Sequence, residues 1–236
     1  MDSSYARRRS QLRTYFDETA AETWARLTSD APVSGIRRTV RAGRDRMRAL
    51  LLDSLPHQLA GLRVLDAGCG TGAGAIELAR RGAEVVAIDI SPSLVEIAEQ
   101  RHGNDAAASA GSIRFCSGDM LDSSLGEFDH VLAMDSLIHY ALEDIIAVLA
   151  ALTPRVRDSI VFTFAPRTPA LTLMHLSGRL IPHREHRAPA IVPVAERSLR
   201  RACASAAPLQ GWQCGRSERI SSGFYTSQSM VLRKSA

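Results

Sequence analysis

The chain has 236 residues, of which 45% are hydrophobic and 23% charged, with a formal net charge of +4. This length supports one domain with a sizeable core, and no apolar run approaches the roughly 18 residues that a membrane span needs. The small charge and the 5% aromatic content do not indicate nucleic-acid binding. We expect a soluble protein, at most peripheral to a membrane.

The cysteines and the N-terminus both favour a cytoplasmic protein. No C-x-x-C pair is present, so we expect reduced thiols, with neither a disulfide framework nor a zinc site. The first residues lack the apolar stretch of a secretory signal. The cysteines are Cys69, Cys116, Cys203 and Cys214.

Residues 1–60 carry two helical patterns, which predict an N-terminal helical arm. The apolar residues of the first recur every three or four positions: Leu12, Phe16, Ala20, Trp24 and Leu27. The second runs from about Ile36 to Leu55, and its predicted core face is formed by Ile36, Val40, Met47 and Leu51. Another face is basic, with Arg37, Arg41, Arg44 and Arg48. A solvated helix face and a rim that attracts an anionic substrate both explain these arginines.

From residue 61 onward, strands and helices alternate, which predicts a Rossmann-like α/β domain with a mostly parallel sheet. Five strands are expected at 63–67, 84–89, 113–117, 128–134 and 158–164, with helices that begin at about Ala73, Pro92 and Leu142. A helix at 194–206 and an antiparallel pair at about 210–219 and 223–233 complete a seven-stranded sheet. The segment 166–193 contains five prolines. It is too long for a simple loop and is predicted to be a lid inserted after the fifth strand.

The stretch 63–72 predicts a ligand-binding turn. A short apolar run ends in Asp66, three glycines follow, and a helical pattern begins at Ala73. A strand, a glycine loop and a helix in this order present backbone N–H groups and a helix N-terminus to a ligand. Glycine is needed where a side chain would clash or forbid the backbone angles. The glycines are Gly68, Gly70 and Gly72.

Two classes of ligand fit this loop. Gly68, Gly70 and Ala73 satisfy the G-x-G-x-x-G/A pattern of dinucleotide binding. A pyrophosphate would lie near Asp66, however, which is unfavourable in a partly dry site. S-adenosylmethionine has no phosphate: Asp66 can attract its ammonium while glycine N–H groups take its carboxylate. Asp89 closes the next strand and can accept both ribose hydroxyls. The pattern resembles the class I S-adenosylmethionine-dependent methyltransferases, with an NAD-dependent dehydrogenase as the alternative.

The ends of the next two strands supply further candidates. Asp119 can accept from the adenine amine and Met120 can pack on the ring, although acids are also common in ordinary turns. The fourth strand leads into His139 and Tyr140, at the sheet edge where ligands bind in such folds. A buried core histidine is the alternative for His139.

The pair His183 and His186 lacks an acidic third partner, so no metal site is predicted.

Several motifs are spread over nearly the whole chain: Tyr15-Phe-Asp17 with Trp24, the arginine-rich run 37–44, the glycine loop, Asp135-Ser-Leu-Ile-His-Tyr140, Phe164-Ala-Pro-Arg-Thr168 and Gly223-Phe-Tyr225. Together they resemble one family, the magnesium protoporphyrin IX O-methyltransferases of bacteriochlorophyll synthesis. Family members often have lysine where Arg167 stands, and the charge is kept. The resemblance implies methyl transfer from S-adenosylmethionine to one propionate of Mg-protoporphyrin IX, which gives the monomethyl ester.

The expected site follows from the motifs and the resemblance together. Catalytic candidates are His139, Tyr140 and Tyr15. Cofactor-binding candidates are Asp66, Gly68, Gly70, Thr71, Asp89, Ile90, Asp119, Met120, Met134 and Ser136. Candidates for the second porphyrin carboxylate are Arg37, Arg38, Arg41, Arg44 and Arg167.

Three alternatives stay open at this point. One is a methyltransferase for another small acid or amine, and another is the dehydrogenase. The third is a non-enzymatic protein that binds S-adenosylmethionine and is a partner of magnesium chelatase. The resemblance implies a contact with the large porphyrin-binding subunit of the chelatase. We also expect the protein to be cytoplasmic and at most peripherally associated with the inner membrane.

Overall fold

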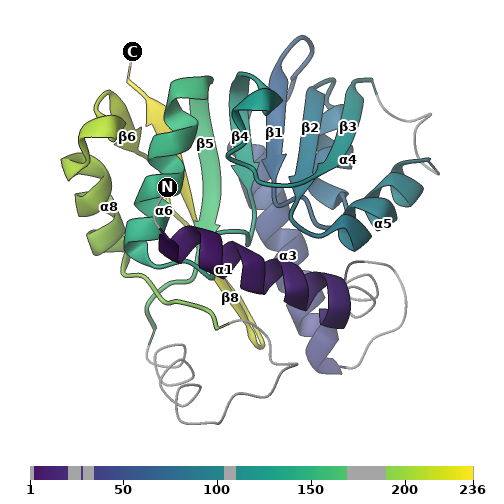
Figure 1. Cartoon of the computed structure of the whole chain (residues 1–236), viewed down its shortest axis with the longest axis horizontal. Coiled ribbons are helices and arrows are strands. Elements are labelled where there is room, and N and C mark those ends of the chain that lie inside the picture. Colours follow the sequence, from purple (N-terminus) through teal and green to yellow (C-terminus); the bar gives the residue numbers. More distant parts are fainter. Residues whose placement is uncertain (1–2, 21–27, 29–34, 104–109, 169–189, 236) are drawn as a thin grey trace.

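The computed structural model describes residues 3–20, 28, 35–103, 110–168 and 190–235 (Figure 1). Its centre is a sheet of eight strands in the order β3-β2-β1-β4-β5-β8-β6, with β7 paired to β8. The parallel strands are β1 (Arg63–Ala67), β2 (Glu84–Asp89), β3 (Ser112–Ser117), β4 (Phe128–Ala133) and β5 (Val156–Phe164). The predicted Rossmann-like fold is confirmed, and the strand order reverses between β1 and β4.

The sheet has eight strands and not the predicted seven, and the difference lies at its far edge. The expected strand at 210–219 is two strands, β6 (Trp212–Cys214) and β7 (Arg219–Ser222), which both pair antiparallel with β8 (Tyr225–Lys234). Cys214 pairs with Leu232 of β8, and Arg219 pairs with Gln228. Five residue steps from Cys214 to Arg219 therefore match four steps along β8, and the extra residue forms a bulge that interrupts the ladder. The predicted hairpin is present between β7 and β8.

Helices cover both faces of the sheet. One apolar cluster joins the sheet to α1 (Ser3–Thr14), α6 (Leu142–Leu152) and α8 (Glu196–Ser205). The other joins it to α3 (Gly35–Asp53) and α4 (Ala73–Arg80). Neighbouring residues of β1 divide between the clusters, with Val64 in one and Leu65 in the other, because successive side chains of a strand point to opposite faces. A further helix, α5 (Pro92–Gly103), lies between β2 and β3 in the chain.

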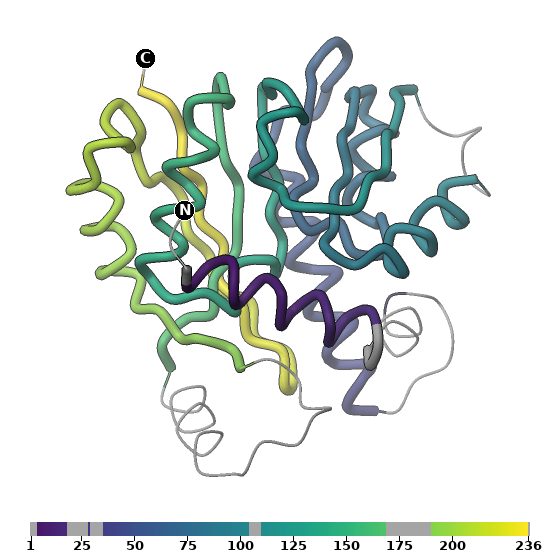
Figure 2. Tube along the Cα trace, viewed as in Figure 1, coloured from purple at the N-terminus to yellow at the C-terminus, as the bar shows by residue number. Residues whose placement is uncertain are grey.

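The N-terminal arm forms the two expected helical segments. The first is α1 with a π-helical turn, η1 (Tyr15–Ala20), and α1 crosses in front of the sheet (Figures 1 and 2). Trp24 and Leu27 lie outside the described residues. In α3, Met47 and Leu51 are buried as predicted, but Ile36 is 59% exposed, so its assignment to the core face was wrong. Ile36 is in the first turn of α3, beyond the sheet that covers the later turns.

The two ends of the predicted lid lie side by side. A β-bridge joins Pro166 to Val194, and the Val194 N–H donates to the Ala165 carbonyl over 2.8 Å. The segment therefore leaves and re-enters the domain at one place, while 169–189, with His183 and His186, lies outside the described residues. Within the described part of the chain, no helix has the length and apolarity to cross a membrane.

Candidate active site

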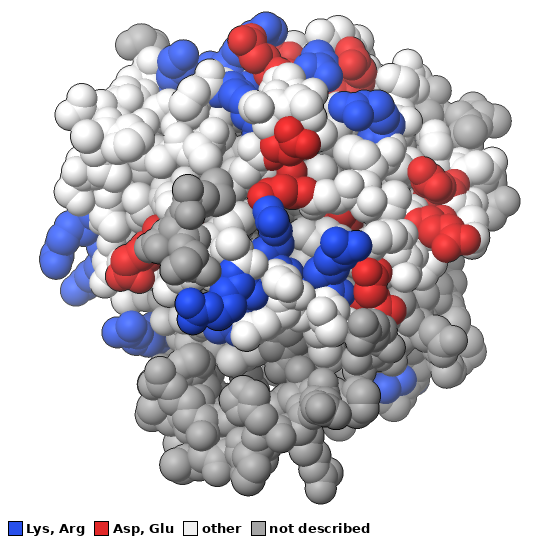
Figure 3. Space-filling model, viewed as in Figure 1, with Lys and Arg blue, Asp and Glu red and all other residues white. Residues whose placement is uncertain are grey.

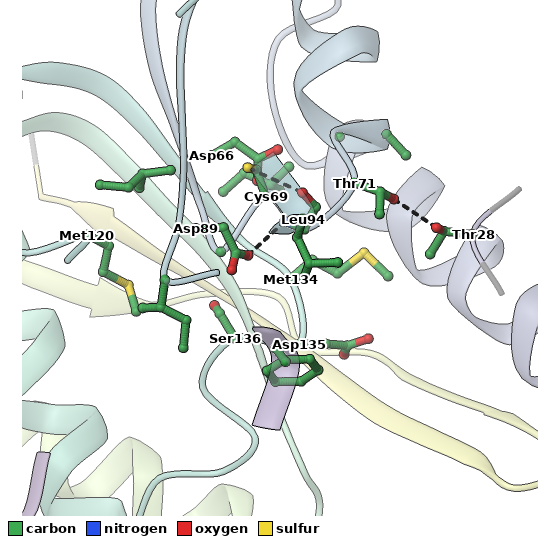
Figure 4. A pocket seen from close by; sticks show the side chains of 18 of the residues that line it. Thr28, Asp66, Cys69, Thr71, Asp89, Leu94, Met120, Met134, Asp135 and Ser136 are labelled. Carbon is green, nitrogen blue, oxygen red and sulfur yellow. Dashed lines mark hydrogen bonds between the residues drawn. The ribbon is translucent and has the colours of Figure 1, made fainter. Parts of the chain in front are cut away.

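A cavity opens at the carboxyl ends of β1, β2 and β4, where the strand order reverses and ligands bind in open α/β sheets. The space between its walls is about 1150 Å³, open solvent included. Most of the predicted cofactor residues line it: Asp66, Gly68, Gly70, Thr71, Asp89, Ile90, Met120, Met134 and Ser136. Figure 4 shows side chains from the glycine loop, the β2 end and the β4 end converging on this space.

The glycines of the loop are required by close packing. Gly68 has φ +84°, and a Cβ there would lie 2.6 Å from the Ser136 Cβ. Gly72 has φ +83° and caps the N-terminus of α4. Side chains would therefore strain both positions, and at Gly68 a side chain would also force the β4 end away from the loop.

The N–H groups of this loop are used inside the protein, which differs from the expectation that they take the donor carboxylate. The N–H groups of Gly68 and Cys69 donate to the Ile88 carbonyl, over 2.8 and 3.0 Å. The Gly70 N–H donates to Asp89 over 2.8 Å. The loop thus shapes the cavity floor and orients Asp89, and its glycines leave room for a ligand.

Two acids face the cavity from the ends of β1 and β2. Asp66 is buried, and burial together with the nearby charge of Asp89 raises its pKa to about 7. Among the described residues, Asp66 Oδ2 and Ser136 Oγ are buried without a hydrogen-bond partner. Burial also raises the pKa of Asp89. A cationic group that enters here would satisfy Asp66 and favour its ionised form, as the ammonium of S-adenosylmethionine would do.

The third-strand acid has a different environment. Asp119 accepts a hydrogen bond from the Tyr5 hydroxyl over 2.8 Å and pairs with Arg9, so it anchors α1. It is not among the described residues that line the cavity, although its neighbours Gly118 and Met120 are. Its adenine-binding role stays a prediction. Tyr5 was not predicted as a contact of this acid, although its helical spacing of four and seven residues from Arg9 and Leu12 places it on the same face of α1.

The catalytic candidates are placed differently from one another. His139 and Tyr140 line the cavity, and His139 Nδ1 lies 3.3 Å from the Ala190 carbonyl. Tyr140 is buried and stacks on Tyr5, with ring centroids 5.2 Å apart. Burial raises the pKa of the Tyr140 hydroxyl, so it stays protonated at neutral pH. Tyr15 packs against Phe16, which is itself a lining residue, and the role of Tyr15 stays a prediction.

The arginines of α3 divide into two groups. Arg41, Arg44 and Arg48 line the cavity, and Arg44 forms a 2.6 Å ion pair with Asp135. Arg37 and Arg38 are exposed and are not among the lining residues, and the same holds for Arg167. Figure 3 shows further basic side chains over α1, where the sequence has Arg7, Arg8, Arg9 and Arg13. The arginines that can reach a ligand in this cavity are those in the middle of α3. Arg48 was missed as a site residue, although it continues the same helical spacing.

The four cysteines are free, and no group of three or more potential metal ligands occurs among the described residues.

The parallel sheet, the glycine loop and the two acids define a class I S-adenosylmethionine-dependent methyltransferase. A general methyltransferase-domain family model matches residues 64–158, and the model of the magnesium-protoporphyrin IX methyltransferase C-terminus matches residues 133–234. The chain belongs to the magnesium-protoporphyrin O-methyltransferase family, because it is 47% identical to the Rhodobacter capsulatus enzyme of that name over 99% of this chain and 100% of that protein.

A sequence and a crystal structure from Synechocystis support this membership. Its magnesium-protoporphyrin O-methyltransferase is 32% identical over 72% of this chain and 74% of that protein. The crystal structure of magnesium protoporphyrin IX methyltransferase from the same organism, with SAH bound, superposes with a TM-score of 0.80 at 29% identity. The superposition covers 97% of this chain and 100% of the Synechocystis chain.

Proposed function

We infer that the protein is an S-adenosylmethionine-dependent O-methyltransferase that esterifies one propionate of Mg-protoporphyrin IX, to give the monomethyl ester in bacteriochlorophyll biosynthesis. The observation that carries this function is the end-to-end likeness to the Rhodobacter capsulatus enzyme, at 47% identity. The cavity supports it, since it combines acids suited to the donor with arginines suited to a carboxylate acceptor.

The donor supplies an electrophilic methyl group, and the protein holds it in place. We propose that Asp66 binds the ammonium, because a carboxylate with one unsatisfied buried oxygen gains most from a cation. Asp89 keeps acceptor capacity for the ribose, although it already accepts from Gly70 and Ser91. Ile90 and Met120 offer apolar contact to the adenine.

The acceptor needs no base to become a nucleophile. A carboxyl whose ordinary pKa is about 4.3 is ionised at pH 7. Rate enhancement then comes from aligning the carboxylate oxygen with the methyl carbon and from removing water. We propose that His139 and Tyr140 orient the acceptor. Arg41, from α3, is the candidate to hold the other propionate, with Arg37, Arg38 and Arg167 as outer contacts if the acceptor extends beyond the described cavity.

The surroundings of the enzyme are also proposed. We expect the enzyme to be located in the cytoplasm at the periphery of the inner membrane. We also expect it to contact the large porphyrin-binding subunit of magnesium chelatase. Two exposed apolar residues, Ile36 and Phe224, support a contact surface near the start of α3. Co-sedimentation of the wild-type protein with inner-membrane vesicles tests the first expectation, and pull-down by the purified chelatase subunit tests the second.

The deciding experiment measures methyl transfer from labelled S-adenosylmethionine. Mg-protoporphyrin IX, metal-free protoporphyrin and a plain dicarboxylate are compared at equal concentration. Transfer to Mg-protoporphyrin IX well above the other two supports the proposed substrate. Equal transfer to the dicarboxylate would indicate a less selective methyltransferase, and absence of transfer to every acceptor would contradict the proposed activity.

A further inference from the structure

Three sequence motifs that lie far apart in the chain meet at one wall of the cavity. They are the Arg41-Ala-Gly-Arg44 turn of α3, the start of the Asp135–Tyr140 stretch after β4, and Gly223-Phe-Tyr225 between β7 and β8. The resemblance of the chain to its family includes all three, yet the functions assigned so far do not use them together. Their meeting point is the carboxylate of Asp135.

Asp135 is bound from three directions. Its Oδ2 accepts from Arg44 over 2.6 Å, and the Tyr225 hydroxyl lies 3.1 and 3.2 Å from its two oxygens. Its Oδ1 also accepts from Ser227 over 3.0 Å and from Thr163 over 3.2 Å. Only 5% of the Asp135 side chain is exposed, and 16% of the Arg44 side chain. The two charges therefore face each other in a largely desolvated wall.

The backbone around this pair is specialised to form it. Asp135 has φ +55°, a left-handed conformation that is uncommon for residues other than glycine. In α3, a Cβ on Gly43 would lie 2.6 Å from the Tyr225 ring, so only glycine lets the helix approach β8 this closely. The Ser222 hydroxyl also donates to the Thr39 carbonyl of α3 over 2.8 Å. These contacts fix Arg44 beside Asp135.

We propose that Asp135 is a positioning residue that fixes Arg44 in the cavity wall and compensates its charge, so that the acceptor carboxylate is oriented without being held in a tight ion pair. This inference rests on the proposed substrate. It assigns to Asp135 a role that sequence reasoning did not find, and it separates Arg44 from the other arginines of α3.

The physical reason lies in the difference between binding and catalysis. An uncompensated arginine in a desolvated wall would bind an incoming carboxylate strongly in the ground state. The carboxylate loses its charge as the ester forms, so such an interaction is weaker in the transition state and lowers kcat. Asp135 already occupies one side of the guanidinium, which reduces this ground-state attraction. Ser136, the next residue, packs against Gly68 of the donor loop, so the pair lies close to the donor.

The test compares Asp135→Asn, Arg44→Gln and the double variant. Affinity for Mg-protoporphyrin IX is measured by absorbance titration, and kcat and KM by methyl transfer. Asp135→Asn should bind the porphyrin at least about threefold more tightly and turn over at least about threefold more slowly. Arg44→Gln should bind it more weakly, because Asp135 then repels the carboxylate. The double variant should return to within about twofold of the wild-type affinity.

Two controls separate charge compensation from a general structural effect. Mg-protoporphyrin IX dimethyl ester has no free carboxylate, so its affinity should not change in any of the variants. Glu127→Gln breaks a 3.0 Å acid–arginine pair with Arg157 at the opposite end of β4 and should change neither affinity nor turnover. If Asp135→Asn does not fold, Arg44→Gln decides the question, since it should weaken binding of the free acid and not of the diester.

Weaker binding of both porphyrins in Asp135→Asn and in Arg44→Gln would overturn the inference and assign the pair to the fold alone. Unchanged affinity and turnover in both variants would overturn it as well. If the wild-type protein itself does not methylate Mg-protoporphyrin IX, the proposed function fails, and that outcome is distinct from a failure of the role of Asp135.

Discussion

Asp66 offers a prediction in which function and stability oppose each other. The ionised carboxylate is unfavourable in the buried site, because burial and the charge of Asp89 raise its pKa from 3.8 to about 7. For an acid, a raised native pKa means that the folded state holds the proton more tightly. The contribution of Asp66 to the stability of the protein is therefore most favourable below the pKa that Asp66 has in the unfolded chain, and it falls as the pH rises toward 7.

The magnitude follows from the shift. A difference of about three pKa units corresponds to about 4 kcal/mol, at about 1.4 kcal/mol per unit. Asp66→Asn cannot ionise, so we expect its free energy of unfolding to exceed that of the wild type by up to about 4 kcal/mol at pH 8. At pH 5 the difference in the free energy of unfolding should be only about 2 kcal/mol, because Asp66 is then still protonated in the folded protein and ionised mainly in the unfolded chain.

The same variant should lose affinity for the donor. Replacing a carboxylate that binds an ammonium removes a charged hydrogen bond of about 1.5–3 kcal/mol, or about 10- to 100-fold in Kd. Denaturant unfolding of the ligand-free protein at pH 5 and pH 8 measures the first effect, and calorimetric titration with S-adenosylhomocysteine measures the second. Asp53→Asn, an exposed acid at the end of α3, is the matched control.

A pH-independent difference in stability would refute the assigned pKa shift. Unchanged affinity for S-adenosylhomocysteine would refute the assignment of Asp66 to the ammonium. In the wild type, affinity should also rise between pH 6 and pH 8, by about tenfold for a group that titrates near 7, since binding requires the ionised form.

Four further predictions concern the loop, the arm and the acceptor side. Gly68→Ala should lower stability by about 1–3 kcal/mol and weaken donor binding, because its backbone is left-handed and its Cβ would meet the β4 end; thermal unfolding with and without S-adenosylhomocysteine measures both. Tyr5→Phe removes the hydroxyl that holds Asp119 and should cost about 1 kcal/mol, seen by denaturant unfolding. His139→Ala should lower kcat without adding or removing a titration near neutrality in the pH–rate profile. Arg41→Gln should raise KM for the porphyrin more than it lowers kcat.

Each of these predictions has a contradicting result. Wild-type donor affinity in Gly68→Ala would show that the loop tolerates a side chain. Unchanged stability in Tyr5→Phe would mean that the hydroxyl does not hold the arm. Loss of a neutral titration in His139→Ala would reinstate a general base, and an unchanged KM in Arg41→Gln would remove this arginine from the acceptor site. Arg46→Gln, at an exposed position of the same helix and outside the described cavity, is the comparison for the last variant.

Much of the fold could be predicted because its signals are local. Alternating apolar strands and helices locate β1 to β5 within one or two residues. The donor-binding roles of the residues at the strand ends stay predictions. The predictions were wrong where the answer depends on distant partners. Ile36 has the spacing of a core residue, but the sheet does not extend over the first turn of α3. The strand at 210–219 is divided because its register is set by β8.

The class of the protein could be predicted from a short part of the sequence, because the strand, glycine loop and helix at 63–80 and Asp89 at the end of the next strand lie close together in the chain. How the charges are shared depends on packing between distant segments. Loop N–H groups are used within the protein, Asp119 holds α1, and Arg44 is paired with Asp135. Arg44 and Asp135 are separated by 91 residues, and only packing of α3 against β8 brings them within 2.6 Å. Spacing along a helix predicts which arginines share a face, but the partner of each arginine depends on the fold.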